Sequence, residues 1–325
     1  MMKKIKKIAV LTSGGDAPGM NAAIRAVVRA AISSGLEVDG IRRGYMGLIE
    51  EDIIEMNAMS VTDIVQRGGT ILYTSRCPEI KEKKGLKRAV SVCKQHNIDG
   101  LITIGGDGTF RGAQDLSELG LNTIGIPGTI DLDIACTEYT IGFDTACNTA
   151  MEATDKVRDT SASHERCSII EVMGRTAGHI ALWCGISNGS ECVLLPERSD
   201  KDDEQKIINK IIRKRRIGKK HHIILKTEGM GDSYELAKRI EKATGIETRA
   251  TVIGHIQRGG NPTCKDRVYA SAMGAKAVDL LIEGKTNRVV AYRHGKFCDY
   301  DIGEALSMSK DIDKLLYALT ERLSR

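Results

Sequence analysis

The sequence predicts an α/β protein with mostly parallel sheets. Short apolar runs typical of buried strands alternate with longer segments of helical pattern along the chain, as in repeated strand–helix units. Glycine accounts for 34 of the 325 residues, which suits many tight turns between strands and helices. This length fits two domains of ordinary size, each able to bury its own core.

The first strand–helix unit sets the pattern for the rest. An apolar run at residues 7–12 enters a glycine turn, and a helix is predicted near residues 18–34, with Pro18 in its first turn and Gly35 at its end. Trp183 is expected in the core. The further predicted strands are 36–41, 98–104, 122–127, 167–173, 191–195, 222–227, 249–255 and 288–293, and the clearest further helices are 145–160, 203–216, 232–244 and 264–284.

Composition argues against several classes of function. The net charge of +5 is modest and aromatic residues make up only 4%, so neither a nucleic-acid partner nor a base-stacking surface is expected. The nine cysteines are scattered without zinc spacing, which favours reduced thiols in a cytoplasmic protein. No segment has the roughly 20 apolar residues that cross a bilayer, and the basic start is not followed by a signal-peptide pattern.

The candidate chemistry lies where three predicted strands end in glycine and carboxylate. The run 8–11 leads to Ser13–Asp16, the run 101–104 leads to Gly105–Thr109, and the run 123–126 leads to Pro127–Asp133. Glycines allow backbone N–H groups to approach a phosphate, and carboxylates beside them can hold the Mg²⁺ that accompanies a nucleotide. Ligands bind beyond the carboxyl ends of strands in open α/β sheets, so these segments predict phosphoryl transfer.

Each of these segments also has a plainer interpretation. Gly105–Thr109 is compatible with a glycine turn that binds nothing, or with a loose dinucleotide fingerprint in which Asp107 would repel the pyrophosphate. Asp131 and Asp133 taken alone would suit a solvated acidic loop. Arg25 and Arg29 share one helical face, where they repel each other slightly unless an anion binds between them.

Other enzyme classes are disfavoured by missing motifs. The chain has no G-x-x-x-x-G-K-[ST] phosphate loop, no protein-kinase motif set and no G-x-S-x-G serine frame. A kinase of this sequence would therefore be neither a P-loop enzyme nor a protein kinase.

Six segments in order along the chain resemble the bacterial ATP-dependent 6-phosphofructokinase family. They are Gly14–Asn21, Gly105–Gly108, Pro127–Asp131, His164–Arg166, Met173–Arg175 and Gly254–Gly260. The resemblance covers essentially the whole chain. It implies two three-layer α/β/α domains between which the chain crosses more than once: an ATP-binding domain of residues 1–142 plus 257–307, and a sugar-phosphate-binding domain of residues 143–256 plus 308–325.

The resemblance implies transfer of the ATP γ-phosphoryl group to the 1-hydroxyl of fructose 6-phosphate in glycolysis. Asp131 matches the base, Thr129 and Arg175 match groups on the transferring phosphoryl, and Asp107 with Asp133 nearby matches the Mg²⁺ site. The ATP-site matches are Gly15, Arg76, Cys77, Gly106, Asp107, Gly108 and Thr109. The sugar-site matches are Thr129, Ile130, Asp131, Arg166, Met173, Gly174, Arg175, Glu228, Arg249, His255, Ile256, Gln257 and Arg258, with Arg166 and Arg249 reaching in from a neighbouring subunit.

The resemblance also implies a homotetramer regulated by ADP or phosphoenolpyruvate between subunits. The positions that match this effector site are Arg25, Arg29, Arg158, Gly189, Ser190, Glu191, Ile217, Lys219, Lys220 and His221. Glu191 would make a metal-linked contact to the effector phosphates. No membrane or nucleic-acid partner is expected.

Two positions depart from the family pattern. Leu132 stands where the family commonly has asparagine, and Ile217, next to Arg216, stands where it has a basic residue. Glycine at positions 108 and 128 favours ATP, because pyrophosphate-using relatives carry bulkier charged residues there. An NAD-kinase-like enzyme would share G-G-D-G-T but leave the other segments unexplained, and Leu132 alone supports a non-catalytic nucleotide sensor of the same fold.

Overall fold

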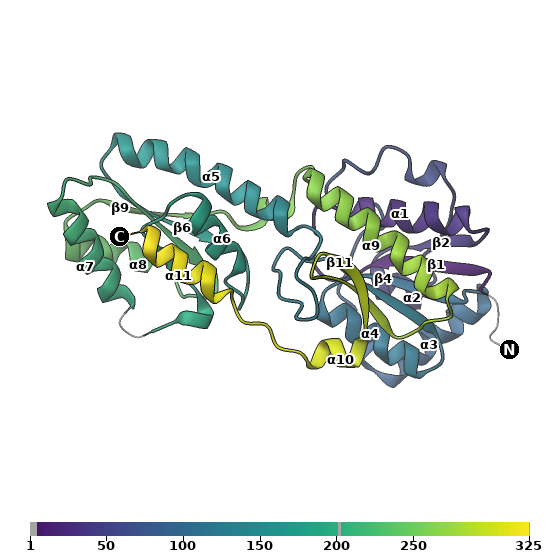
Figure 1. The fold of residues 1–325 in the computed structure, drawn as a ribbon. Coiled ribbons are helices and arrows are strands. Elements are labelled where there is room, and N and C mark those ends of the chain that lie inside the picture. Colours follow the sequence, from purple (N-terminus) through teal and green to yellow (C-terminus); the bar gives the residue numbers. More distant parts are fainter. Residues whose placement is uncertain (1–4, 201–202, 325) are drawn as a thin grey trace. The chain divides into compact units, whose positions relative to one another are not determined.

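The computed structural model of the chain describes residues 5–200 and 203–324. Its backbone divides into two compact units, each built around its own sheet (Figure 1). Unit 1 comprises Met1–Ile130, Ile134–Thr145 and Arg258–Lys310, and unit 2 comprises Asp131–Asp133, Ala146–Gln257 and Asp311–Arg325. The predicted α/β class, with mostly parallel sheets and a chain that crosses repeatedly between its two parts, is confirmed.

Unit 1 contains a seven-stranded sheet in the order β11-β10-β5-β4-β1-β2-β3. Its strands are parallel except for β3 and β11, which pair antiparallel at the two edges. The central strands are buried because their apolar runs are covered on both faces. The strands are β1 (Lys7–Thr12), β2 (Glu37–Ile41), β3 (Ile53–Met56), β4 (Gly100–Gly105), β5 (Asn122–Pro127), β10 (Arg288–Arg293) and β11 (Lys296–Asp301).

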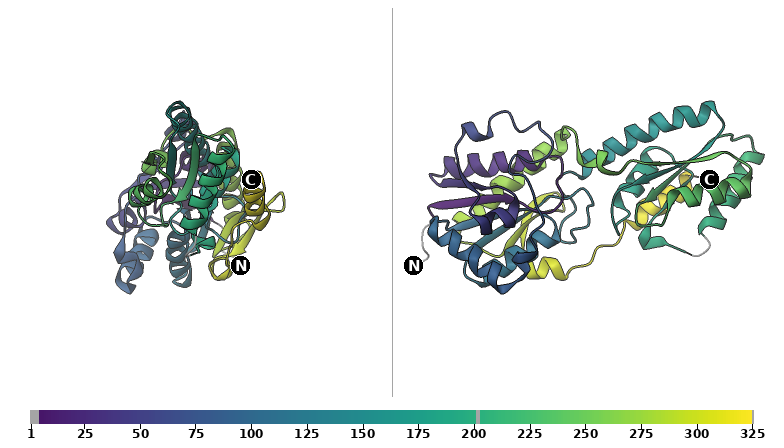
Figure 2. Two further views of the ribbon diagram at one scale, coloured as in Figure 1. Left: turned by 90° about the vertical axis from the view of Figure 1, so that its left-hand side faces the viewer. Right: turned by 180° about the vertical axis from the view of Figure 1, so that it is seen from behind.

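Helices cover both faces of this sheet. Consecutive residues of β4 show this: a Cβ on Gly100 would contact Leu281 of α9, whereas Leu101 packs in a core with Tyr45 of α2, Val92 of α3 and Leu116 of α4. Helices α1 and α9 run side by side (Figures 1 and 2). The helices are α1 (Met20–Ser33), α2 (Gly44–Glu50), α3 (Lys83–Gln95), α4 (Asp107–Glu118), α9 (Cys264–Ile282) and α10 (Ile302–Ser307), with short 3-10 turns at Met59–Val61 and Pro78–Lys81.

Unit 2 contains a parallel sheet in the order β7-β8-β6-β9. Ile169 of β6 and Ile224 of β8 pack against Ile211 of α7 and Ile240 of α8 on one face. Helix α6 contacts β8, and α11 contacts α6. The elements are α5 (Phe143–Ser163), β6 (Cys167–Val172), α6 (His179–Ser187), β7 (Cys192–Leu194), α7 (Asp203–Arg216), β8 (His222–Thr227), α8 (Ser233–Thr244), β9 (Thr248–Val252) and α11 (Lys314–Leu323), with 3-10 turns at Pro196–Arg198 and Gly254–Arg258.

The structure corrects three local predictions. Helix α1 begins at Met20 rather than at Pro18, because Gly19 before it has a left-handed conformation with φ of 107°. The strand expected to reach residue 255 ends at Val252, since a 3-10 turn begins at Gly254. Trp183 is 42% exposed on α6, so its expected place in the core was wrong.

Candidate functional site

The three glycine–carboxylate segments follow neighbouring strands of unit 1. Strands β1, β4 and β5 are adjacent and parallel, so their carboxyl ends meet at one edge of the sheet. Hydrogen bonds join the segments that leave them: Ser13 N donates to Ile104 O over 2.9 Å, and Gly128 N donates to Gly105 O over 2.9 Å. The tertiary structure thus brings together backbone segments that lie far apart in the sequence.

Gly106 and Asp107 form the N-terminus of α4. Gly106 is the N-cap and Asp107 is the first helical residue, where the helix dipole and free N–H groups favour a bound anion. Asp107 and Gly108 are exposed. A Cβ on Gly106 or on Gly108 would meet no other atom within 4 Å, so space for a ligand adjoins this turn.

The remainder of the turn is held rigidly by buried contacts. Thr109 Oγ1 donates to Ser13 O over 3.1 Å, and Tyr45 Oη donates to Thr109 O over 2.6 Å. A Cβ on Gly105 would lie 2.4 Å from Ser13 O, so only glycine allows this close approach of β1 and β4. These buried contacts therefore fix the position of the first turn of α4, whose other face is exposed.

Gly15 lies against a residue from the far end of the sequence. Arg258 Nη1 donates to Asp16 O over 3.0 Å, and a Cβ on Gly15 would lie 2.5 Å from the same nitrogen. The guanidinium group thus covers the turn after β1. Of the other predicted ATP-site residues, Arg76 is exposed, and Cys77 is partly buried before the 3-10 turn, where burial raises the pKa of its thiol.

Asp131 and Arg175 lie together in unit 2. The Asp131 side chain is 3% exposed, and its Oδ2 lies 3.8 Å from Arg175 Nε, whose own side chain is 67% exposed. Thr129 is half-buried and Ile130 is buried, whereas Asp133 is exposed. A buried carboxylate beside an exposed guanidinium offers a proton acceptor next to a phosphate-binding cation.

The segment that carries Arg175 is fixed by side chains from two other loops. Glu228 Oε1 accepts hydrogen bonds from Gly174 N over 3.2 Å and from Arg175 N over 2.8 Å, and Gln257 Oε1 accepts one from Met173 N over 2.8 Å. Arg175 adopts a left-handed conformation with φ of 54°, and these bonds hold it there. Glu228 and Gln257 therefore position the backbone of this segment.

Leu132, which departs from the pattern that the resemblance implies, has a special backbone conformation. Its φ is 56°, in the left-handed region that asparagine adopts more readily than leucine does. The Leu132 side chain is 6% exposed, so burial of its apolar surface offsets part of this conformational cost. Asparagine at this position would therefore adopt the observed backbone conformation at a lower cost than leucine does.

Arg166 and Arg249 share one carboxylate, that of Glu247. Arg166 Nε lies 2.7 Å from Glu247 Oε2, and Arg249 Nη2 lies 2.5 Å from Glu247 Oε1. The hydrogen bonds from Arg166 and then from Arg249 lower the pKa of Glu247. Sequence reasoning missed Glu247, although its position two residues before Arg249 at the edge of β9 was a usable signal. His255 and Ile256 are exposed on the following 3-10 turn.

Two of the predicted effector residues of unit 2, Glu191 and Lys219, are paired with each other. Glu191 is buried, contacts Lys219 Nζ through Oε1 and accepts a hydrogen bond from Ile223 N through Oε2. Burial lowers the pKa of His221. In the same unit, Arg158 donates a hydrogen bond to Asn188 O, and Lys220 forms an ion pair with Glu165. Ser190 is buried, whereas Gly189 is exposed and the Ile217 side chain is 80% exposed. The two remaining predicted effector residues, Arg25 and Arg29, lie on α1 of unit 1.

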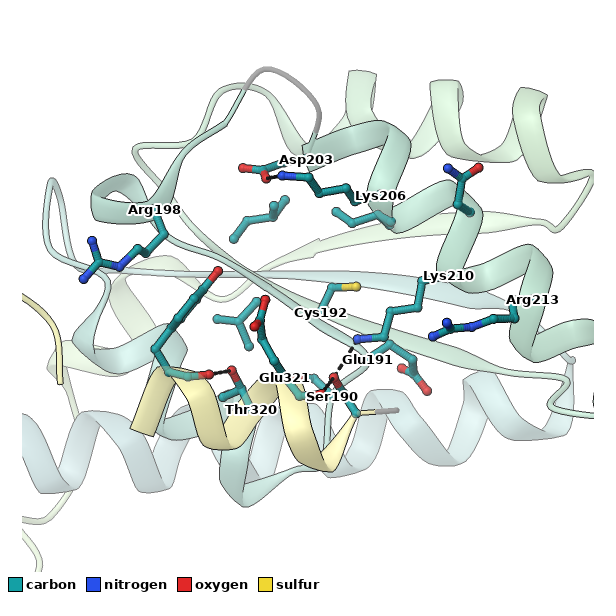
Figure 3. Close-up of a pocket in the computed structure, with 16 residues that line it drawn as sticks. Ser190, Glu191, Cys192, Arg198, Asp203, Lys206, Lys210, Arg213, Thr320 and Glu321 are labelled. Carbon is teal, nitrogen blue, oxygen red and sulfur yellow. Dashed lines mark hydrogen bonds and ion pairs between the residues drawn. The ribbon is translucent and has the colours of Figure 1, made fainter. Parts of the chain in front are cut away.

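A cavity of about 570 Å³ lies along β7 in unit 2 (Figure 3). Lys206, Lys210 and Arg213 of α7 line one side, and residues of α11 line the other. Only Ser190 and Glu191 of the predicted effector set line it. The cavity is therefore largely distinct from the residues that the sequence singled out.

Within 5–200 and 203–324 there is no group of three or more His, Cys, Asp or Glu side chains arranged to hold a metal ion. In that same part of the chain, no helix is both long enough and apolar enough to cross a membrane.

Comparison with known proteins gives one consistent family. The sequence pattern of the family described as Phosphofructokinase matches residues 7–281. The ATP-dependent 6-phosphofructokinases of Clostridium botulinum strains Hall and Langeland are each 56% identical over 321 residues, which span 99% of this chain and the whole of each relative.

Solved structures agree with this match. Phosphofructokinase from Saccharomyces cerevisiae superimposes with a TM-score of 0.86 at 31% identity, over 98% of this chain and 48% of that chain. Pichia pastoris phosphofructokinase in the T-state gives a TM-score of 0.89 at 32% identity, over 100% of this chain and 37% of that one. This chain thus spans less than half the length of either yeast chain.

Proposed function

The chain belongs to the phosphofructokinase family, and from that premise we propose that it transfers the γ-phosphoryl group of ATP to the 1-hydroxyl of fructose 6-phosphate. The observation that carries the proposal is the full-length identity of 56% with proteins named ATP-dependent 6-phosphofructokinase. The products would be fructose 1,6-bisphosphate and ADP, as in glycolysis.

Asp131 is the proposed general base. Its carboxylate is buried beside Arg175, so it is shielded from water yet faces a cation suited to phosphate. Asp131 would accept the proton of the sugar hydroxyl as the phosphoryl group departs from ATP, while Arg175 and Thr129 stabilise charge on the transferring group. Most of the rate enhancement would come from positioning and charge stabilisation.

The turn before α4 is the proposed phosphate site for ATP. Gly106 and Gly108 offer backbone N–H groups at a helix N-terminus, and the open space at both glycines leaves room for a nucleotide. Thr109 belongs to the same proposed set, and its own backbone N–H closes the turn by donating to Gly106 O over 2.9 Å. Gly15, Arg76 and Cys77 complete the proposed ATP set. Arg258 covers Gly15, so this guanidinium could stabilise negative charge beside the same turn.

Mg²⁺ is the proposed metal, with Asp107 and Asp133 as its protein ligands. Both carboxylates are exposed, and carboxylate oxygens are the hard ligands that Mg²⁺ prefers. In nucleotide enzymes this ion takes one or two carboxylates plus phosphate oxygens rather than a full protein cage, so the residues fit. When bound, the ion would neutralise charge on the β- and γ-phosphate oxygens.

The proposed sugar site includes Arg166 and Arg249 supplied by a neighbouring subunit. Both arginines form ion pairs with Glu247. A sugar 6-phosphate would therefore have to displace the Glu247 carboxylate or share the two guanidinium groups with it. Met173, Gly174, Glu228, His255, Ile256, Gln257 and Arg258 would form the rest of the site. This arrangement requires self-association, and we propose a homotetramer.

Regulation by ADP or phosphoenolpyruvate is proposed at the effector set that includes Arg158, Glu191, Lys219 and His221. Lys219 is held by Glu191, so an anionic effector would compete with that carboxylate for the lysine. A cytoplasmic location is proposed as well. The nine cysteines carry free thiols, which suit a reducing compartment.

A coupled assay for fructose 1,6-bisphosphate tests the proposed activity. Purified protein is supplied with fructose 6-phosphate, Mg²⁺ and either ATP or pyrophosphate. We expect turnover when ATP is the phosphoryl donor and none when pyrophosphate is. Strong turnover with pyrophosphate and none with ATP would contradict the proposed donor. If no fructose 1,6-bisphosphate forms with either donor but ADP binding is measurable, the protein would instead be a nucleotide sensor.

A further inference from the structure

Lys226 is a fully buried lysine near the carboxyl end of β8. Its side chain has 0% exposure, and its Nζ lies 2.7 Å from Oε2 of Glu171. The two residues are cross-strand partners in the register of β6 and β8. Lys226 is removed from water completely and Glu171, at 16% exposure, is removed in large part. Apolar residues of similar volume are often at least as stable as a buried ion pair. The position therefore calls for a reason other than stability.

Glu171 joins both ends of the loop between β8 and α8. Lys226 lies just before this loop, and Ser233, the first residue of α8, donates its hydroxyl to the same Glu171 oxygen that Lys226 contacts. Ser233 is buried and the Glu171 side chain is 16% exposed, so this contact is largely shielded from solvent. We call Lys226, Glu171 and Ser233 the buried triad. Both ends of the loop of residues 228–232 are thus fixed to one carboxylate of β6.

The loop fixed by the buried triad carries Glu228. Glu228 Oε1 holds the backbone N–H groups of Gly174 and Arg175, and a Cβ on Gly229 would lie 2.4 Å from Arg175 O. Arg175 Nε in turn lies 3.8 Å from Asp131 Oδ2. A continuous series of contacts therefore runs from Lys226, through the β8–α8 loop, to the Arg175–Asp131 pair.

We propose that Lys226, acting through Glu171 and Ser233, is a positioning residue of the transfer site. The buried triad clamps the β8–α8 loop so that Glu228 holds Arg175 in its left-handed conformation opposite Asp131. This role rests on the proposed function of Asp131 and Arg175. A small displacement of reacting groups can lower a rate by as much as ~10²-fold, so an indirect contact of this kind can control catalysis.

The first test needs no activity. Hydrogen–deuterium exchange is compared for the unmodified protein, Lys226→Met, and the control Lys214→Met, which makes the same substitution at another buried lysine of unit 2. Amides of residues 173–177 and 228–232 should exchange about tenfold faster in Lys226→Met alone, as expected for local opening. Equal exchange of these segments in all three proteins would overturn the proposal, whether or not the protein is a kinase.

The second test is kinetic. Lys226→Met should lower kcat/KM for fructose 6-phosphate by about tenfold while the KM for ATP stays near its original value. The double variant Lys226→Met/Glu171→Leu removes both charges, so it should regain thermal stability but not activity, because Ser233 has still lost its partner. Recovery of both would show a purely structural pair and overturn the proposal.

The two tests separate this inference from the proposed function. If the unmodified protein lacks phosphofructokinase activity, the proposed function fails, and the exchange experiment still decides whether the buried triad holds the loop. If exchange rises but the kinetic constants match those of Lys214→Met, the loop is held without positioning the site, and the proposal is wrong.

Discussion

Arg175 Nε lies 3.8 Å from Oδ2 of Asp131, and this pair combines an exposed guanidinium with a carboxylate that is almost fully buried. The two residues are 44 positions apart by their residue numbers, 175 and 131. A cation beside a buried carboxylate offsets part of the cost of taking that charge out of water, and an exposed arginine remains available to a phosphate. The pair is therefore the natural starting point for mutational tests.

Replacing Asp131 with asparagine should lower kcat by about 10²- to 10⁴-fold, because the amide cannot accept the hydroxyl proton. The KM values for ATP and fructose 6-phosphate should change little, since asparagine keeps the shape of the side chain. Steady-state kinetics with a matched thermal-unfolding curve provide the measurement. A kcat within about threefold of the unmodified enzyme would remove Asp131 from the role of base.

Gly108→Asp should weaken the use of ATP without unfolding the protein. The new Cβ meets no atom within 4 Å, and an acidic residue suits the first turn of α4. A like charge about 4 Å from a phosphate costs about 1 kcal/mol in water and about 4 kcal/mol near a protein surface, so kcat/KM for ATP should fall tenfold or more.

The contrasting glycine of the same helix provides the control for this prediction. A Cβ on Gly112 would lie 2.9 Å from the Tyr45 ring. The main effect of Gly112→Ala should therefore be a lower thermal stability, in contrast to Gly108→Asp. Unchanged kcat/KM for ATP in Gly108→Asp would argue that the phosphates bind elsewhere.

Asp266→Ala should destabilise unit 1 by about 4 kcal/mol, because it leaves several buried donors without an acceptor. Asp266 is 0% exposed and accepts hydrogen bonds from Tyr139 Oη at 2.6 Å, Gly142 N at 2.7 Å, and Thr145 N and Oγ1 at 2.9 and 2.5 Å. Urea unfolding measures the change. As a control, Asp313→Ala removes only the exposed N-cap of α11 and should cost about 1 kcal/mol.

His222 should make stability depend on pH in the mildly acidic range. Burial lowers the pKa of His222 from 6.5 to about 4, and Lys214, Lys219, His221 and Glu191 are the charged groups that act on it. Between pH 6.5 and 4 the unfolded state binds the proton and the folded state does not, so stability falls as pH falls. Protonation of this group should therefore lower the free energy of unfolding by about 2 kcal/mol between pH 7 and pH 5.

The matched variant for this prediction is His222→Met. It removes the titrating ring but keeps an apolar side chain at a fully buried position. Urea unfolding at pH 7 and pH 5 should show a clearly smaller loss of stability in the variant. Parallel losses in both proteins would mean that other groups account for the acid sensitivity.

Much of the fold followed from local patterns in the sequence. The strands at 122–127, 222–227 and 288–293 were predicted with the bounds that the structure has, because apolar runs flanked by turn residues mark buried strands. Strands β3 and β11 were missed. Both are antiparallel edge strands with partly exposed residues, so neither carries the continuous apolar run of a buried parallel strand.

The sequence by itself determined the class of fold, the order of its central elements, and the glycine and carboxylate residues at the strand ends, because these depend on neighbours along the chain. Only the tertiary structure decided that Arg258 covers Gly15, that Glu247 holds Arg166 and Arg249, and that Lys226 is buried on Glu171. These contacts join residues on different elements or depend on how side chains point, and no local periodicity encodes them.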